Sequence, residues 1–169
     1  KIVLLADFEV DSTAKYVEKG STLDLNGYTL KFLRTPDASS KSGSSLLRIK
    51  ANSTFTITSS AIGGKIFEGA AYKHNNGASV PFAALEGTLA TLNVIGKNEA
   101  GETTLSYYGG TLAQAYGNRG SVNVDGGYYC RNRSDNFALF DMRVLSDCSF
   151  KNAIFDTKSG GTLALSGRN

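Results

Sequence analysis

The chain of 169 residues contains no tryptophan, one histidine and two cysteines. So few histidines and cysteines do not make a set of metal ligands, and the sequence therefore predicts no zinc-type site. Neither a nucleophile elbow nor a phosphate-binding loop occurs, so the motifs typical of serine hydrolases and of nucleotide-binding proteins are missing. We expect the protein to bind no cofactor.

Long apolar runs are also missing. A helix that crosses a membrane needs about 18 or more consecutive apolar residues, and the sequence contains no such run. We therefore predict no insertion into a membrane. The formal net charge is only +3, which by itself argues neither for nor against a nucleic-acid or acidic partner. We predict no nucleic-acid partner.

The chain has only 2 prolines but 19 glycines, and it is rich in serine and threonine, a composition typical of β-structure with many turns. Four short stretches alternate apolar and polar residues in the same way, and they begin at residues 21, 53, 90 and 120. These starts are 32, 37 and 30 residues apart. Such spacing, with strict alternation, predicts one such strand per repeating unit and one strand face directed inward.

Aligned on one another, the four stretches predict how side chains stack between units. Two apolar columns are expected to form the core, and a polar column between them is expected to face outward. The apolar columns are Leu23, Phe55, Leu92 and Val122, and Leu25, Ile57, Val94 and Val124; the polar column is Asp24, Thr56, Asn93 and Asn123.

Each unit continues with two further strands. In the first full unit a turn at Asn26–Gly27 precedes a strand over 28–32, a loop over 34–45 and a third strand over 46–50, on which Arg48 and Lys50 are expected to face water. Later units repeat this order, with strands expected over 63–67 and 80–85, 103–108 and 112–116, and 128–130 and 137–140, before a partial unit from 150 to 165.

The repeats predict an all-β fold, a right-handed, single-stranded parallel β-helix (a β-solenoid). It has about five coils that stack roughly 4.8 Å apart. Residues 1–169 are expected to form one domain. The chain begins within a strand-like apolar run, Lys1–Leu5, and we expect a piece of a longer protein. Its ends are expected to be covered by neighbouring domains or by further copies of the chain.

The two cysteines, Cys130 and Cys148, are 18 residues apart, which is less than one unit. We therefore do not expect them to lie directly above one another, and we interpret them as two separate small core residues. The sequence alone leaves a disulfide bond open, and with it the redox compartment.

The stretch Ser21–Leu30, with the sequence STLDLNGYTL, resembles the opening coil of right-handed parallel β-helix proteins of the pectin-lyase-like superfamily. That superfamily includes bacterial surface proteins, such as adhesins, and phage tail spikes, as well as polysaccharide lyases and hydrolases. The resemblance covers most of the chain as a fold pattern. It implies an extracellular, cell-surface or virion location and a polysaccharide or surface glycan as partner, and it says little about activity.

Glycoside hydrolysis ordinarily uses two carboxylates about 5–10 Å apart. The column of Asp24 contains no second acidic residue, and its nearest acidic neighbour by column is Asp125, three coils away. We therefore expect a non-catalytic recognition or scaffold domain. Two alternatives stay open. One is a part of a polysaccharide lyase, a glycoside hydrolase or a tail-spike depolymerase whose active site is incomplete in this chain, and the other is a purely structural spacer.

Insertions at one point of a solenoid repeat project from one side, where ligands often bind. We expect the loops over 34–45, 68–79, 97–102 and 131–135 to cluster in this way. Tyrosine rings stack on sugars, and basic groups pair with sugar carboxylates. One residue of each adjacent tyrosine pair must nevertheless face the core. The glycan-binding residues predicted on this basis are Tyr72, Tyr107, Tyr108, Tyr128, Arg131 and Arg133.

Overall fold

The computed structural model describes residues 1–10, 15–32, 45–69, 81–115, 120–131, 138–142 and 146–157, and these residues form seventeen β-strands and no helix. The strands build three parallel sheets, and each strand pairs with the strand three places later in the chain. One circuit of the chain therefore contributes one strand to each sheet. This arrangement is a single-stranded parallel β-helix, which confirms the predicted fold class.

The sheets are named here A, B and C in the order in which the chain visits them. Sheet A contains β1 (Ile2–Val3), β4 (Ser21–Asp24), β7 (Thr54–Thr58), β10 (Thr91–Gly96), β13 (Ser121–Gly126) and β16 (Asp147–Lys151). Sheet B contains β2 (Phe8–Val10), β5 (Thr29–Phe32), β8 (Gly64–Glu68), β11 (Leu105–Gly109), β14 (Tyr128–Arg131) and β17 (Ile154–Asp156). Sheet C contains β3 (Lys15–Val17), β6 (Leu47–Lys50), β9 (Ala83–Glu86), β12 (Ala113–Ala115) and β15 (Phe140–Met142).

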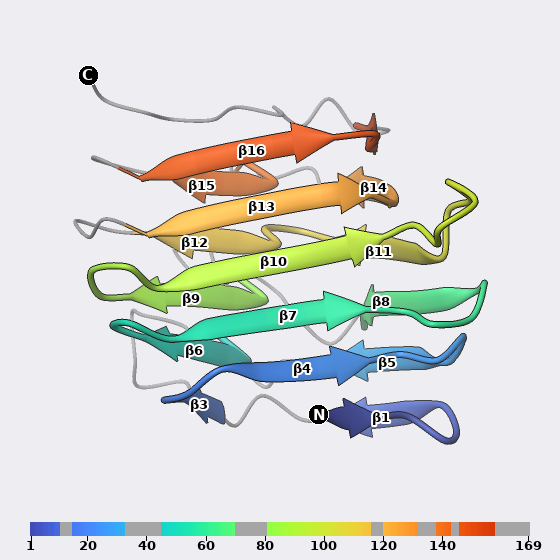
Figure 1. Ribbon diagram of the computed structural model, residues 1–169, viewed down its shortest axis with the longest axis horizontal. Helices are drawn as coiled ribbons and strands as arrows, with labels where there is room; N and C mark the ends of the chain where they lie inside the picture. Colours follow the sequence, from blue (N-terminus) through green and yellow to red (C-terminus); the bar gives the residue numbers. More distant parts are fainter. Residues whose placement is uncertain are drawn as a thin grey trace.

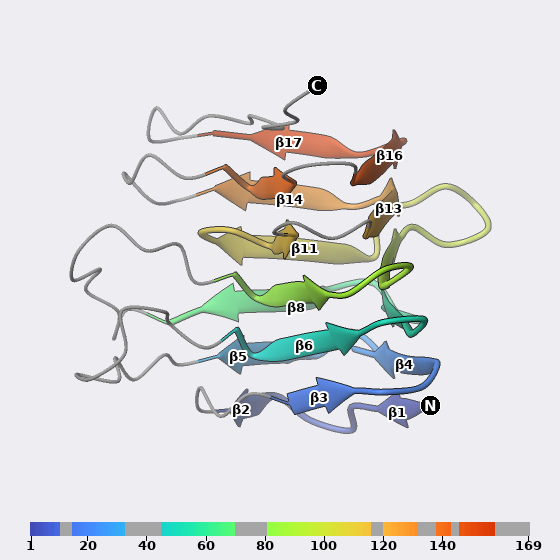
Figure 2. The same ribbon diagram turned by 90° about the vertical axis from the view of Figure 1, so that its left-hand side faces the viewer.

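The coils wind in a right-handed sense. Figure 1 shows the strands of sheet A in front, all running from left to right, with the strands of the other two sheets running back behind them. The coils rise from β1 at the bottom to β16 at the top, and this direction of travel with this rise defines a right-handed helix. Figure 2 shows the same coils, turned by 90°, as separate layers. Right-handed crossovers are the rule between parallel strands of a sheet.

The described residues make six coils, whereas the sequence predicted about five. The additional coil is the first one, formed by β1, β2 and β3, and it lies beneath the coil of β4 because Ile2 pairs with Leu23. Its strands are only two or three residues long. Strands this short show no alternation, so the sequence indicated only a strand-like run at Lys1–Leu5.

Alternation along sheet A sets the core, as predicted for the middle coils. Phe55, Leu92 and Val122 lie in register on successive coils, as do Ile57, Val94 and Val124, and all six are buried. Each such side chain contributes about 1.5–3 kcal/mol by leaving water. The predicted inward columns are therefore confirmed on β7, β10 and β13.

The predicted alignment of the coil of β4 is wrong by two residues. Leu23 was expected beside Phe55, but it pairs with Ile57, and Ser21 takes the place beside Phe55. Because a strand has a period of two, a shift of two residues leaves every side chain on its own face. Alternation therefore could not distinguish the two alignments, and the packing of the turns decides between them.

The second and third strands of each unit lie close to their predicted places. The clearest difference is β15, which begins at Phe140, whereas a strand over 137–140 was expected. The predicted strand near residues 163–165 lies outside the described residues. Cys130 lies on β14 and Cys148 on β16, which belong to different sheets, and both are free thiols. This confirms two separate cysteines.

Candidate functional site

The outer face of sheet B carries a group of aromatic and charged side chains, here called the sheet B patch. Its members come from β8, β11, β14 and β17, four successive coils of the same sheet. Because these strands stack in register, about 4.8 Å apart, the side chains share one continuous surface. The patch consists of Lys65, Phe67, Tyr108, Tyr128 and Asp156.

Two tyrosines form the centre of the patch. The ring centroids of Tyr108 and Tyr128 are 5.8 Å apart, and the ring planes are inclined by 48°. The Nζ atom of Lys65 lies 5.7 Å from the centroid of the Tyr108 ring, which is within the range of a cation–π contact. Tyr128 is 38% exposed and Phe67 36% exposed, so part of each ring is open to solvent while the sheet holds it in place.

A short hydrogen bond orients the upper tyrosine. The Oη atom of Tyr128 donates to Oδ2 of Asp156 over 2.5 Å. This bond, with a smaller effect from reduced hydration, raises the pKa of Tyr128 above its ordinary value. The phenol therefore stays protonated and acts as a donor to Asp156. The ring of Tyr128 is thus fixed by its own strand and by the coil above.

The predicted binding residues separate into surface and interior positions. Tyr108 and Tyr128 lie on the outer face. Tyr107, in contrast, stands in register with Ile66 and Tyr129 and is fully buried. Arg131 is also fully buried, so in this fold neither side chain lies on the surface that was expected to bind a ligand. Tyr72 and Arg133 lie outside the described residues. Glycan binding by these residues stays a prediction.

Arg131 occupies an inward position that the sequence did not reveal. It pairs with Gly109 on the coil below, and a Cβ atom at Gly109 would lie 2.9 Å from Oε2 of Glu68 on the next coil down. The missing side chain leaves room for the buried Glu68 carboxylate, whose Oε2 accepts a hydrogen bond from the amide of Gly110 over 2.6 Å. The inside of this corner is therefore polar, and Arg131 belongs to it.

The expected clustering of the four loops is wrong for one of them. Residues 97–102 connect β10 to β11, that is, sheet A to sheet B, whereas the segments after β5, β8 and β14 connect sheet B to sheet C. The 97–102 loop is a hairpin with an antiparallel bridge between Lys97 and Thr103. It therefore projects at a different corner, as Figure 2 shows at the right. The loops over 34–45 and 68–79 lie largely outside the described residues, as does 131–135.

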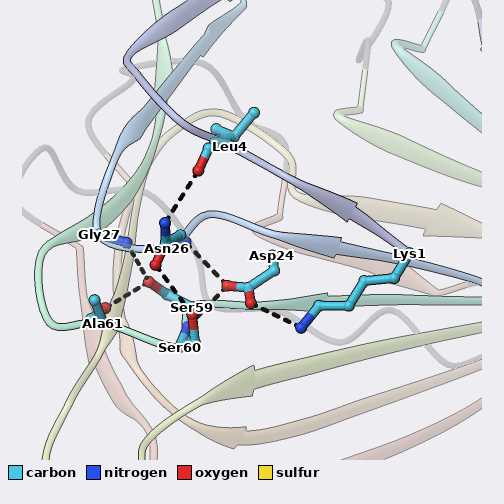
Figure 3. Close-up of polar contacts among 8 residues, drawn as sticks. All are labelled: Lys1, Leu4, Asp24, Asn26, Gly27, Ser59, Ser60 and Ala61. Atoms are coloured by element: carbon cyan, nitrogen blue, oxygen red, sulfur yellow. Dashed lines mark hydrogen bonds and ion pairs between the residues drawn. The ribbon is translucent and has the colours of Figure 1, made fainter.

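Asp24 was expected to face water, but it is only 1% exposed and is the centre of a polar corner between coils (Figure 3). Its Oδ1 accepts the amides of Asn26, at 2.9 Å, and Ser60, at 2.8 Å, while Oδ2 lies 3.1 Å from Nζ of Lys1. Burial alone would raise the pKa of Asp24, but these hydrogen bonds outweigh it and hold the pKa below its ordinary value. The carboxylate is thus ionised and fully engaged.

The rest of this corner consists of turn residues that bond across coils. Asn26 has a positive φ of 49° and donates its side-chain amide to the carbonyl oxygen of Leu4 over 3.2 Å. The amide of Gly27 donates to Oγ of Ser59 over 3.0 Å, and Ser59 in turn donates to the carbonyl oxygen of Ala61 over 2.6 Å (Figure 3). Because the bonds from Asn26 to Leu4, from Gly27 to Ser59 and from Ser60 to Asp24 cross between neighbouring coils, the corner joins coils, and its one described carboxylate is already bonded.

Arg48 and Lys50 point outward from sheet C, as predicted, but they are half-buried and not simply surrounded by water. Each makes an ion pair with Glu86 on the next coil. Sequence reasoning missed this pairing because Glu86 lies 36 residues beyond Lys50. The only hint of a shared partner in the sequence was the two-residue alternation of the strand, which places Arg48 and Lys50 on the same face.

In the part of the chain that the structure describes, no group of three or more His, Cys, Asp or Glu could hold a metal ion. The described residues also contain no helix that is long and apolar enough to cross a membrane. Comparisons of the chain with protein-family models, with curated proteins and with solved structures found no match.

Proposed function

We propose that this β-helix is a non-catalytic glycan-recognition domain of an extracellular or virion surface protein, and that the glycan binds to the sheet B patch. The observation that carries the proposal is the pair of partly exposed rings, Tyr108 and Tyr128, 5.8 Å apart on one rigid sheet. Aromatic faces stack on the apolar faces of sugar rings. Lys65 and Asp156 beside them offer a donor and an acceptor for sugar hydroxyl groups.

Recognition fits the patch better than hydrolysis does. The patch contains one carboxylate, Asp156, which accepts the hydrogen bond of Tyr128, whereas glycoside hydrolysis ordinarily uses two carboxylates about 5–10 Å apart. The resemblance of Ser21–Leu30 to the pectin-lyase-like superfamily supports the same class of partner. The proposal includes that the chain itself belongs to this superfamily, which contains bacterial surface proteins and tail spikes.

The affinity expected of one patch is modest. An aromatic contact contributes about 0.5–1.5 kcal/mol beyond its buried area, so two rings give weak binding to one glycan. Several patches on one surface, or one patch against a polymer with repeated sugars, would raise the effective affinity without any new contact. The proposal therefore concerns repetitive polysaccharides or dense surface glycans.

The direct test removes the two rings together. The double variant Tyr108→Ala/Tyr128→Ala should bind immobilised acidic and neutral polysaccharides about tenfold more weakly than the wild-type protein, as measured by affinity electrophoresis, because two stacking contacts are lost. Ile95→Ala is the matched control, since Ile95 is 42% exposed on the outer face of sheet A. Arg131 is left unchanged because it is buried.

Each outcome distinguishes the alternatives. A folded double variant that is retained as strongly as the wild type would remove the patch from the glycan site. A wild type that is retained by no polysaccharide would favour the spacer. Release of reducing or unsaturated ends by the purified wild type, lost in the double variant, would favour an enzyme.

A further inference from the structure

A second group of charged side chains lies around an exposed aromatic ring on sheet C, a different sheet from that of the sheet B patch. Tyr16 comes from β3, Arg48 and Lys50 from β6, and Glu86 from β9, which are neighbouring strands at the lower left of Figure 1. Tyr16 pairs with Arg48, and Lys50 pairs with Glu86. Three successive coils thus place these four residues on one outward face.

The cluster is held together by contacts within it. Nη1 of Arg48 lies 3.1 Å from Oε1 of Glu86, and Nζ of Lys50 lies 2.9 Å from Oε2 of the same carboxylate. Cζ of Arg48 is 5.8 Å, and Nζ of Lys50 is 4.6 Å, from the centroid of the Tyr16 ring. Both cations are therefore fixed beside a ring that is 55% exposed.

This cluster has more hydrogen-bond donors than acceptors. A guanidinium group has five N–H donors and an ammonium group has three, but within the described part of the chain each of these two cations makes one ion-pair contact, in both cases with Glu86. The Nε atom of Arg48 is buried and has no hydrogen-bond partner among the residues that the structure describes. Such an unsatisfied buried donor is costly, and a water or an ion is one of the groups that satisfy it in native proteins.

The residue above Arg48 offers no acceptor for that donor. Arg48 pairs with Ala84 on β9, and the methyl side chain of Ala84 has no hydrogen-bond acceptor. Glu86, two residues further along the same face, is the acceptor on that coil. Its single carboxylate is shared between two cations, so the charge of this group of four remains positive.

We infer that Arg48 and Lys50 bind an oxyanion, the carboxylate or sulfate group of an acidic ligand, beside the ring of Tyr16. Arg48 supplies its second terminal guanidinium nitrogen, Lys50 supplies a second point of positive charge, and the buried Nε–H of Arg48 reports on the bound anion. Glu86 positions both cations, and its own negative charge limits the affinity. The site does not depend on the sheet B patch, and it stands or falls separately from the proposed function.

The test is an NMR titration of the full 169-residue chain, with ¹H–¹⁵N detection of the arginine Nε–H groups. Sodium sulfate, sodium glucuronate and glucose are added at constant ionic strength, balanced with NaCl, so that general screening does not change. We expect saturable shifts of the Arg48 Nε–H signal with sulfate and with glucuronate, and none with glucose.

Variants assign the site. Arg48→Gln and Lys50→Gln should each weaken oxyanion binding about tenfold, since each removes a charge-assisted bond. Glu86→Gln should strengthen binding several-fold because the competing carboxylate is gone. Lys31→Gln is the matched control: Lys31 is an exposed lysine that makes a 2.7 Å ion pair with Glu9 on sheet B, and its loss should change nothing. The two lysine variants and Glu86→Gln carry the test if Arg48→Gln does not fold.

The two sources of the oxyanion give different results. If glucuronate binds more tightly than sulfate, and Tyr16→Ala removes that difference only, the ligand is an acidic sugar whose ring lies on Tyr16. Equal affinities, both insensitive to Tyr16→Ala, assign a free oxyanion. A linear, unsaturated response, or binding that is unchanged in the folded Lys50→Gln and Glu86→Gln variants, would overturn the site.

Discussion

At the scale of single residues, the buried charges of this protein are held by partners from other coils. Asp24 is bonded by the amide of Ser60, 36 residues later, and Glu68 by the amide of Gly110, 42 residues later. A buried carboxylate without such donors would be very costly. The position of each acid in a strand could be predicted, but its partner could not, because the turns of different coils set it.

Asp24 gives a prediction that depends on pH. Its folded pKa is lowered from the ordinary value of an aspartate, so folding favours the ionised form. The stability that it contributes is present above the unfolded pKa, about 3.9, and is lost as the pH falls through the folded pKa. Asp24→Asn keeps an acceptor but loses the charge opposite Lys1, and should cost about 1–2 kcal/mol at pH 7.

Urea unfolding of the wild type and Asp24→Asn at pH 7 and at pH 2.5 measures this contribution. The difference in the free energy of unfolding should shrink as the pH falls. Asn93→Asp, on the outer face of sheet A, is the control for adding or removing an exposed carboxyl group. An equal difference at both pH values would mean that the charge of Asp24 does not stabilise the fold.

The tyrosine pairs show how far residue-level prediction reaches. Alternation requires one ring of each pair to face the core, and Tyr107 and Tyr129 are those rings. The face could not be assigned beforehand because a shift of one residue exchanges the two sides. Arg131 follows Tyr129 by two positions and so shares its inward face. Its charge favoured the surface, and the sequence did not show that it pairs with Gly109 on the coil below and is fully buried.

At the scale of elements, turns determine the alignment of coils where strands cannot. Sheet A strands were predicted from alternation, and three of them pair as expected. The coil of β4 is displaced by two residues because its corner is fixed by Asp24, Asn26 and Ser59. Sheet C strands are three or four residues long, so their boundaries carried little signal in the sequence.

Close stacking of corners requires glycine at one position of β10. A Cβ atom at Gly96 would lie 2.6 Å from Cα of Gly127 on the next coil, and backbone cannot move aside as a flexible side chain does. Gly96→Ala should therefore destabilise the protein by about 1–3 kcal/mol. At Gly20 an added Cβ meets no atom within 4 Å, so Gly20→Ala should lie within about 0.5 kcal/mol of the wild type.

Thermal unfolding followed by circular dichroism compares the two glycine variants. A clearly lower melting temperature for Gly96→Ala alone would support the corner packing described here. If both variants melt like the wild type, the coils at this corner are further apart than in the structure.

At the scale of the whole molecule, six coils make a short stack whose first coil is an open end. Ile2 and Phe8 stand in register with Leu23 and Leu30, yet they are 60% and 54% exposed. Lys15 holds the corresponding place below Leu47, and a charge at an inward position of an edge strand discourages pairing with other edges. Covering of the ends by neighbouring domains or further copies stays a prediction.

The stack also determines what the surface offers. Each sheet presents its outward columns along one side, so side chains from distant parts of the sequence meet on a common face. The sheet B patch joins four coils, and the sequence indicated only its two tyrosines, not its lysine, phenylalanine and aspartate. Contacts between coils therefore define both candidate sites, and the sequence alone shows them only where the strand alignment is right.

The central claim is that the sheet B patch is a glycan-recognition surface, and chemical-shift mapping tests it most directly. The ¹⁵N-labelled protein is titrated with an oligosaccharide prepared from a polysaccharide that retains the wild type. We predict that the largest saturable shifts fall on Lys65, Phe67, Tyr108, Tyr128 and Asp156, with little change along the outer face of sheet A. Saturable shifts confined to another sheet, or no saturable shifts with any retained polysaccharide, would contradict the claim.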